Sequence, residues 1–390
     1  MIYSVKQGAY LAEIKIMKIK YYLILLFFVP VLLSADLMHS PTWGFRIYLP
    51  IGYEYIEGNG IDRFSFQGPS DSKFDMLVYN LTYPGIDEMV QDISRRLGNT
   101  GDTSFFEYRG KNAAIMELRF AGMEGWALAL ELDSKTAGGK SPLLLALAYA
   151  PVGTDNIDLF HISALNSIAP TTAEMRKPGP VMEFAYPRGQ LRETQLAGGL
   201  GSVMIRENDA DAAQALVEQE FLLLTMYQDA PFWQEAWIRF YRAIYRDSWD
   251  RITNAASQIA RNLNSGSGAA NALPFAQRAL TFVQGFKYER NFDGSDFVNL
   301  VTAVTEGRGD CDSRAMLWAI ILAHTNIQAG IMLSPYYSHA MGIVNIPGPG
   351  ARFEAAGVRW LVAETTANVN IGLIAADQSN PEYWMAVTFE

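Results

Sequence analysis

The chain has 390 residues, of which 49% are hydrophobic and 18% charged, and its formal net charge is −10 at neutral pH. This length is sufficient for two ordinary hydrophobic cores. The negative charge argues against nucleic acid or an anionic membrane surface as a partner. A framework of internal disulfides is excluded, because Cys311 is the only cysteine.

The first 35 residues have the pattern of a secretory signal peptide. Two lysines precede an apolar run at residues 21–33, which ends in two small residues. The run is too short to span a bilayer, which takes roughly 20 residues. We therefore expect a periplasmic or secreted chain that begins near Asp36 and has no transmembrane anchor. Met17, just before this pattern, is an alternative translation start. Four Lys and one Glu lie in the removed segment, so the mature charge is −13.

Residues 36–168 predict an α+β domain with an antiparallel sheet and packed helices. Seven stretches have strand-like patterns, and two are helical. The first helical stretch, 85–98, has one apolar stripe, and the second, 155–169, closes the domain. This order resembles the fold shared by the photosystem PsbP proteins and the Mog1 family, which implies a binding or positioning module. The strand-like stretches are 43–50, 62–68, 74–83, 103–110, 112–121, 125–133 and 141–151.

The remaining chain divides into a joint and a helical region. Residues 169–207 are rich in Pro and Gly, which predicts a linker that partly packs on its neighbours. Residues 208–390 form a second predicted domain, which begins with helices at 209–228, 230–263 and 269–286. The second of these helices has an aromatic stripe, which is typical of a core face. Its predicted solvated side carries Arg239, Arg242 and Arg246.

The cysteine follows a Gly-rich turn and begins an apolar stretch. A helix from about Cys311 to His324 is apolar all round, which predicts a buried central helix. At its N-terminus, unpaired N–H groups and the macrodipole favour a thiolate, so we expect a lowered pKa for Cys311. The alternative, a small buried hydrophobic residue, remains open.

A nucleophilic cysteine needs a base, and the chain has four histidines. His39 lies beside the predicted cleavage site, and His161 lies in the closing helix of the N-terminal region. His324 is on the same helix as Cys311, but about 20 Å away at 1.5 Å per residue. Elimination leaves His339 as the candidate base.

An orienting group for His339 comes from a second predicted strand. Residues 339–346 and 358–366 both read as strands. If they form an antiparallel hairpin with Ile346 opposite Gly357, Glu364 lies opposite His339 and can orient its imidazole. A shift of two residues would still leave the pair diagonal on one face. The pattern therefore supplies a nucleophile, a base and an orienter.

These segments resemble the transglutaminase-like superfamily, including its bacterial cysteine-peptidase branches. The resemblance covers roughly 275–370 and rests on "GRGDCDSR", "SHAMGIV" and "RWLVAETT". It implies a papain-like domain with a central buried helix on an antiparallel sheet. It also implies Cys311 as nucleophile, His339 as general base and Glu364 as orienter. Glu stands here where Asp is commoner in the family.

Three neighbouring side chains have weaker signals. Gln284 is a candidate oxyanion donor beside the backbone N–H of Cys311, although capping a helix end is an equal alternative. Asp312 and Arg314, at the start of the central helix, are expected to be a cap charge and a local ion pair.

We expect no cofactor, with calcium as a weak alternative. An acidic loop carries Asn291, Asp293 and Asp296, whose spacing could hold calcium but lacks the later bidentate Glu of an EF-hand. A solvated turn is the ordinary interpretation of such a loop.

Two functional hypotheses follow. In the first, the Cys311 thiolate attacks an amide carbonyl and passes the acyl group to water, as a peptidase or amidase, or to an amine, as a transglutaminase. The expected substrate is a protein or peptide, with an envelope component as one candidate. In the second, the chain is a non-catalytic envelope binding or scaffolding protein in which these three residues are a relic.

Overall fold

The computed structural model describes residues 37–133, 139–263, 271–290 and 294–389. The predicted signal peptide, with Met17 and Asp36, lies outside the described residues. In the described part of the chain, no helix is long and apolar enough to cross a membrane. The α+β class with antiparallel sheets is confirmed, because both large sheets pair their strands in this way.

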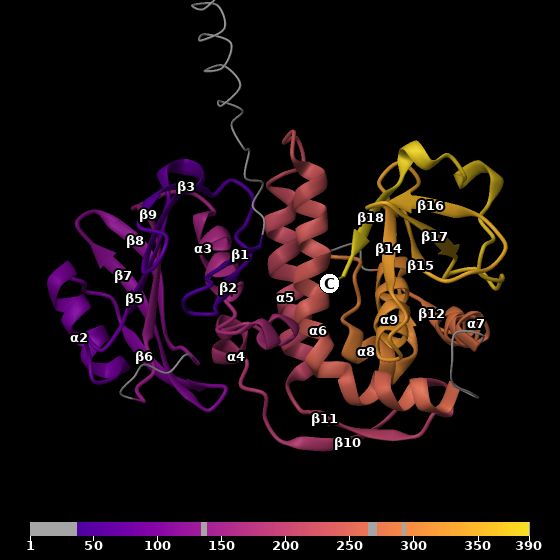
Figure 1. Ribbon diagram of the computed structural model, residues 1–390, viewed down its shortest axis with the longest axis horizontal. Helices are drawn as coiled ribbons and strands as arrows, with labels where there is room; N and C mark the ends of the chain where they lie inside the picture. Colours follow the sequence, from indigo (N-terminus) through magenta and orange to yellow (C-terminus); the bar gives the residue numbers. More distant parts are fainter. Residues whose placement is uncertain (1–36, 134–138, 264–270, 291–293, 390) are drawn as a thin grey trace, which may run out of the picture.

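The N-terminal half is built on a seven-stranded sheet with the order β3-β4-β5-β9-β8-β7-β6. Alternate strand residues enter two different cores, so the sheet is buried on both faces. α2 (Ile86–Leu97) packs on one face and α3 (Ile157–Asn166) on the other (Figure 1). The strands are β3 (Glu54–Gly58), β4 (Arg63–Gln67), β5 (Lys73–Tyr79), β6 (Thr103–Tyr108), β7 (Lys111–Phe120), β8 (Met123–Glu131) and β9 (Leu143–Pro151).

The predicted strand at 43–50 is mostly irregular. Only β2 (Arg46–Ile47) is extended and paired, with β1 (Met38–His39). Its apolar residues still enter the core, which explains the strand-like pattern. The pattern missed β3, because this edge strand is exposed on both faces and has no alternation.

The segment 169–207 contains regular elements that pack on both neighbours. They are η2 (Thr172–Arg176), α4 (Pro180–Ala185) and a hairpin of β10 (Leu191–Gln195) and β11 (Ser202–Arg206). The Arg246 guanidinium donates to the carbonyl oxygens of Asn166, Ser167, Ile168 and Lys177. These bonds fix the chain at the exit from the N-terminal sheet. The boundaries of the two domains stay a prediction.

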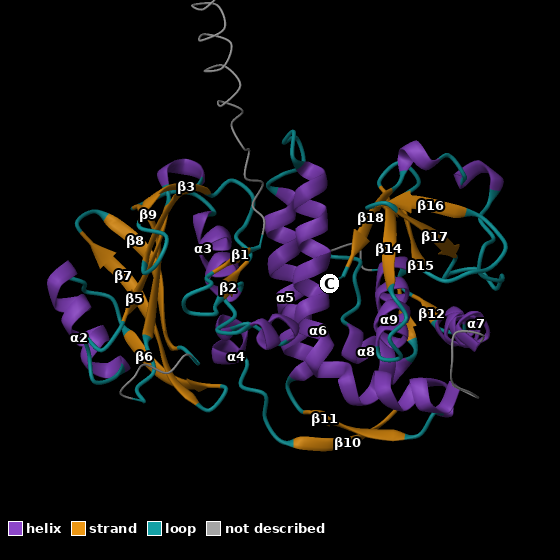
Figure 2. Ribbon diagram, viewed as in Figure 1, coloured by secondary structure: helices purple, strands orange, loops and turns teal. Residues whose placement is uncertain are grey.

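Two long helices, α5 (Asp209–Thr225) and α6 (Trp233–Leu263), lie between the two sheets (Figure 2). The predicted solvated side of α6 is wrong at Arg239, which is only 4% exposed. Arg239 donates to Glu220, to the Ser163 hydroxyl and to backbone carbonyls of the N-terminal half. Periodicity identified the apolar face of α6 but could not show that the N-terminal half covers the opposite face.

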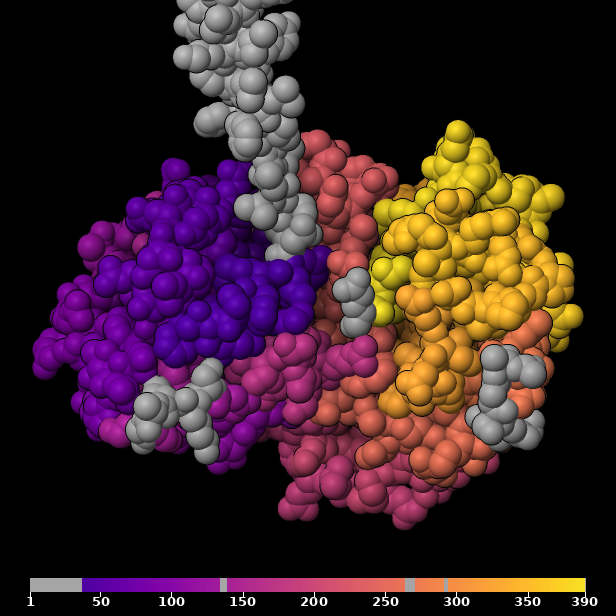
Figure 3. Space-filling view, viewed as in Figure 1, coloured from indigo at the N-terminus to yellow at the C-terminus, as the bar shows by residue number. Residues whose placement is uncertain are grey.

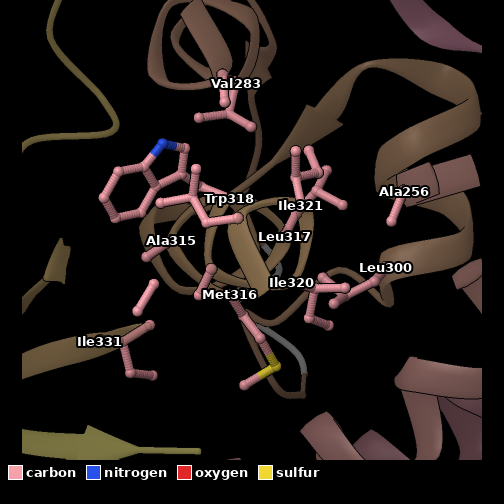
Figure 4. Close-up of a cluster of buried hydrophobic side chains, with 14 of the residues drawn as sticks. Ala256, Val283, Leu300, Ala315, Met316, Leu317, Trp318, Ile320, Ile321 and Ile331 are labelled. Carbon is pink, nitrogen blue, oxygen red and sulfur yellow. The ribbon is translucent and has the colours of Figure 1, made fainter. Parts of the chain in front are cut away.

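The C-terminal half surrounds one buried helix, α9 (Cys311–Ala323), as predicted. Apolar side chains of α9 point in several directions into the core (Figure 4). Helices α6, α7 (Ala272–Gln284) and α8 (Leu300–Glu306) pack against α9, as do two strands of the sheet. Gly342 lies so close to α9 that an added Cβ would stand 2.5 Å from the Trp318 ring.

The second sheet has the order β16-β17-β15-β14-β18. Its strands are β14 (Ala329–Ser334), β15 (His339–Val344), β16 (Arg352–Ala355), β17 (Val358–Ala363) and β18 (Met385–Thr388). A short parallel pair, β12 (Lys287–Tyr288) and β13 (Arg308–Gly309), precedes α9. Short 3₁₀ turns occupy Pro69–Asp71, Ala197–Gly199, Ala376–Gln378 and Pro381–Tyr383. In the space-filling view the indigo N-terminal half and the yellow end of the chain lie on opposite sides (Figure 3).

Candidate functional site

Cys311 is the first residue of α9 and is 8% exposed. The turn before it depends on Gly307, whose φ of 65° is left-handed, and on Asp310, the N-cap residue. The Asp310 carboxylate accepts from the backbone N–H of Ser313 at 2.9 Å and from its hydroxyl. The Gly-rich turn therefore places the thiol at the start of the buried helix, as the sequence predicted.

His339 and Glu364 contact each other directly. The distance from His339 Nε2 to Glu364 Oε2 is 2.7 Å. The other carboxylate oxygen accepts from the backbone N–H and the hydroxyl of Thr366, both at 2.6 Å. Burial raises the pKa of Glu364, but the hydrogen bond and electrostatic influence of His339 and the hydrogen bonds from Thr366 outweigh it, so the pKa lies below its ordinary value. Glu364 is therefore an ionised acceptor for the imidazole.

The predicted strand register is wrong by two residues. Gly342 pairs with Ala363 and Ile343 with Val362, whereas the prediction placed Ile346 opposite Gly357. The reason is that β17 forms its hairpin with β16, across a turn at Ala356-Gly357, instead of with β15. His339 and Glu364 are thus diagonal neighbours, and their side chains still meet.

Cys311 lies beside the start of β15. The backbone of Ala340, the residue after His339, is close enough to lower the pKa of the Cys311 thiol, and the hydroxyl of Thr365, the residue after Glu364, donates to the Cys311 carbonyl at 3.5 Å. His339 also acts through its charge on Asp312, the residue after Cys311. These contacts bring the three predicted catalytic residues together from α9, β15 and the end of β17.

The expected lowering of the Cys311 pKa is wrong. Burial raises the pKa of the thiol, and the carboxylates of Asp312 and Asp310 raise it further, while the Ala340 N–H lowers it. The Asp312 Oδ1 lies 3.4 Å from the sulfur. Burial also raises the pKa of both aspartates. The resting protein therefore carries a thiol, because burial and acidic neighbours outweigh the helix N-terminus.

Asp312 has a partner that the sequence analysis missed. The Tyr241 hydroxyl donates to Asp312 Oδ2 at 2.5 Å. Tyr241 lies on α6, 71 residues before Asp312, and no local pattern marks it. The expected ion pair of Asp312 with Arg314 is not formed: Arg314 is buried and donates to the carbonyls of Gly309 and Phe286 instead.

Gln284 lies next to the site, but its amide group is already used. Its Nε2 donates to the backbone carbonyls of Glu364 at 2.8 Å and Val369 at 2.9 Å. Both amide hydrogens are thereby engaged, so the expected oxyanion role has no donor left. Gln284 instead holds the end of β17 in place. The backbone N–H of Cys311 remains the candidate oxyanion donor.

Metal ligands are sparse near the site. Within the described ranges, Asp310, Cys311 and Asp312 have potential ligand atoms within 4.8 Å of one another. Asp310 already bonds Ser313, however, and acidic groups alone do not define a site. Of the predicted calcium loop, residues 291–293 lie outside the described residues, and Asp296 pairs with Arg290 at 2.8 Å.

The other histidines lie away from Cys311. His161 is fully buried in α3. The His324 ring stacks on Trp249 at 4.4 Å, and its Nδ1 lies 2.9 Å from the Ile320 carbonyl at the far end of α9. His39 is in β1.

No protein-family profile and no curated protein matches the chain. Several solved structures, including the following three, are similar at low levels. Legionella pneumophila LapG (EGTA-treated) is 16% identical with a TM-score of 0.23, over 45% of this chain and 81% of that one. A Bacteroides thetaiotaomicron structure is 8% identical with a TM-score of 0.25, over 84% and 89%. A "putative protease" from Parabacteroides distasonis is 9% identical with a TM-score of 0.22, over 70% and 42%. Similarities this weak carry no argument about activity.

Proposed function

We propose that the protein is an exported cysteine-dependent acyl-transfer enzyme, a peptidase or amidase that acts through Cys311, His339 and Glu364. The contact of His339 with the ionised Glu364, beside a thiol at a helix N-terminus, carries this proposal. Three segments supply the residue types and roles that nucleophilic catalysis needs.

The raised pKa of Cys311 favours proton transfer during attack over a preformed ion pair. His339 Nε2 is bound to Glu364, so Nδ1 is the nitrogen that takes the thiol proton. As the proton leaves, the sulfur forms a bond to the carbonyl carbon of the amide, and the carbonyl oxygen becomes an oxyanion near the Cys311 N–H.

Collapse of this intermediate breaks the C–N bond. The imidazolium of His339 returns the proton to the departing amine, which leaves a thioester on Cys311. Water then attacks the thioester with His339 again as base, releasing a carboxylic acid and restoring the thiol. Glu364 holds the ring in one orientation and stabilises its charged form throughout. Transfer to an amine in place of water would give a transglutaminase.

The non-catalytic alternative is favoured by one observation, the burial of Cys311 at 8% exposure. A peptide-like electrophile that targets thiols separates the two functions. We expect labelling at Cys311 that falls at least tenfold in His339→Ala, while the matched control His324→Gln labels like the native protein. Cys311→Ala should abolish both labelling and any amide hydrolysis. Equal labelling of the native protein and His339→Ala would establish the non-catalytic alternative.

A further inference from the structure

A cavity of ≈ 480 Å³ lies between the N-terminal half and the long helices. Its walls come from β2, α3, η2, α5, α6 and the residue after β18, elements that meet near the centre of Figure 1. None of the three proposed catalytic residues lines it. The volume is in the range of pockets for small organic ligands, roughly 300–1,000 Å³.

The two acidic residues in the wall are already neutralised. Glu220 pairs with Arg239 at 2.6 Å, and both side chains are nearly fully buried. Asp247 accepts two hydrogen bonds from Arg251. Neither carboxylate is therefore available to neutralise the other arginines that line the cavity.

Four more arginines line the cavity without a carboxylate partner among the described residues: Arg46, Arg176, Arg242 and Arg246. The Arg246 guanidinium uses its donors on backbone carbonyls. The Arg46 Nε donates to the Thr172 hydroxyl at 3.0 Å, and the Arg242 Nε to the Thr388 carbonyl at 3.3 Å. Their terminal nitrogens have no hydrogen-bond partner in the described part of the chain.

Arg176 lies over the Trp249 ring at 4.5 Å. The chain has 41 acidic and 31 basic side chains, so a cavity wall with four guanidinium groups that lack a carboxylate partner is opposite in sign to the net charge of the chain.

The rest of the wall is mainly apolar. Tyr245 and Phe389 stack face to face with their centroids 4.0 Å apart, and Leu216 and Met175 also line the space. A bare inorganic anion would leave this apolar surface unused. A neutral apolar molecule would leave the guanidinium groups without a counter-charge.

We propose that this cavity binds a small amphiphilic oxyanion, a carboxylate or phosphate group on an aliphatic body. Arg46 lies on β2 of the N-terminal half, Arg176 on η2 of the connecting segment and Arg242 on α6, so the ligand would bridge the two halves. Guanidinium groups bind carboxylates and phosphates through paired, charge-assisted hydrogen bonds. The proposal goes beyond the proposed catalysis and does not depend on it.

Calorimetric titration of the purified protein tests this with octanoate and octyl phosphate as probes. We expect saturable binding of both, and a rise in the midpoint of thermal unfolding. The tighter of the two identifies a free carboxylate or a lipid-type phosphate as the source. Octyl glucoside, below its micelle concentration, and inorganic phosphate should each bind at least tenfold more weakly. Cys311→Ala should bind like the native protein, so loss of catalysis and loss of this site are separable.

The double variant Arg46→Gln with Arg242→Gln should bind both probes at least tenfold more weakly, while the exposed control Arg261→Gln should not differ. Ala243→Trp fills the cavity with every arginine in place and should abolish binding. Unchanged binding in either variant, or equal binding of octyl glucoside or inorganic phosphate, would overturn the proposal.

Discussion

Two acid–base pairs, an arginine–glutamate pair in the seam between the halves and a histidine–glutamate pair in the candidate site, differ in how completely they are bonded. In the seam, Arg239 and Glu220 are 4% and 3% exposed, and Arg239 uses its donors on Glu220, Ser163 and backbone carbonyls. In the site, the side chains of His339 and Glu364 are 13% and 10% exposed.

The site pair is incompletely bonded, because His339 Nδ1 has no hydrogen-bond partner in the described residues. A pair whose donors and acceptors all have hydrogen-bond partners stabilises the fold. A pair with a free ring nitrogen can still bind a proton and transfer it.

Breaking the site pair should have the largest effect. Glu364→Gln keeps the shape but removes the charge that orients His339, so we expect kcat/KM for a cleaved peptide amide to fall roughly 10³–10⁴-fold. Glu364→Asp should be much milder. The thermal midpoint serves as the control and should change little. Activity within tenfold of native in Glu364→Gln would remove Glu364 from the mechanism.

Breaking the seam pair should instead cost stability. Arg239→Met leaves the Glu220 carboxylate buried and unpaired, which we expect to lower the free energy of unfolding by about 3–5 kcal/mol. Urea denaturation measures this. The double variant Arg239→Met with Glu220→Met should recover most of the loss, and specific activity per folded molecule should stay native. A single variant as stable as the double would mean that the pair is not an energetic unit.

His161 extends the comparison to a buried group with no hydrogen-bond partner at either ring nitrogen. Burial lowers its pKa from 6.5 to about 4. The unfolded chain therefore binds a proton below about pH 6.5 that the folded chain does not bind until about pH 4. The full stability is present above pH 6.5, and about 3 kcal/mol is lost as pH falls to about 4.

Urea denaturation across this pH window tests the effect. In His161→Leu, the part of the slope of unfolding free energy against pH that comes from this group should disappear. The exposed control His39→Leu should keep the native slope. An unchanged slope in His161→Leu would assign the acid sensitivity to other groups.

The smallest effect concerns the thiol. Because burial and its acidic neighbours raise the pKa of Cys311, we expect iodoacetamide to react more slowly with the native protein than with the urea-unfolded chain at pH 8. Asp312→Asn removes one neighbouring carboxylate and should speed the native reaction, by roughly tenfold if the pKa falls by one unit. If iodoacetamide reacts faster with the native protein than with the unfolded chain, Cys311 is a thiolate in the folded protein.

The sequence predicted the parts of the site that local patterns encode. The Gly-rich turn and the apolar run placed Cys311 at the start of a buried helix, and the alternation after His339 placed it at the start of a strand. The strand register failed, because β16 lies between the two predicted strands, where the sequence analysis predicted no strand; it is short and exposed in part. The contact with Glu364 was predicted despite this, since a shift of two keeps the same face.

The electrostatics of the site could not be predicted in the same way. The surroundings of Cys311 include Tyr241, and the burial of Arg239 depends on packing between halves that are distant in sequence. A helical period shows which residues share a face, but only the assembled cores show what covers that face.

The all-round burial of α9 also bears on the order of events during synthesis. The helices that shelter it, α6, α7 and α8, precede it in the chain, whereas the strands β14 and β15 follow it. A chain that emerges N-terminus first would thus hold α9 with one side uncovered until those strands arrive. During that interval Cys311 would have neither His339 nor Glu364 beside it. A partly synthesised chain would therefore be the form most prone to aggregation. It would also lack the assembled candidate site.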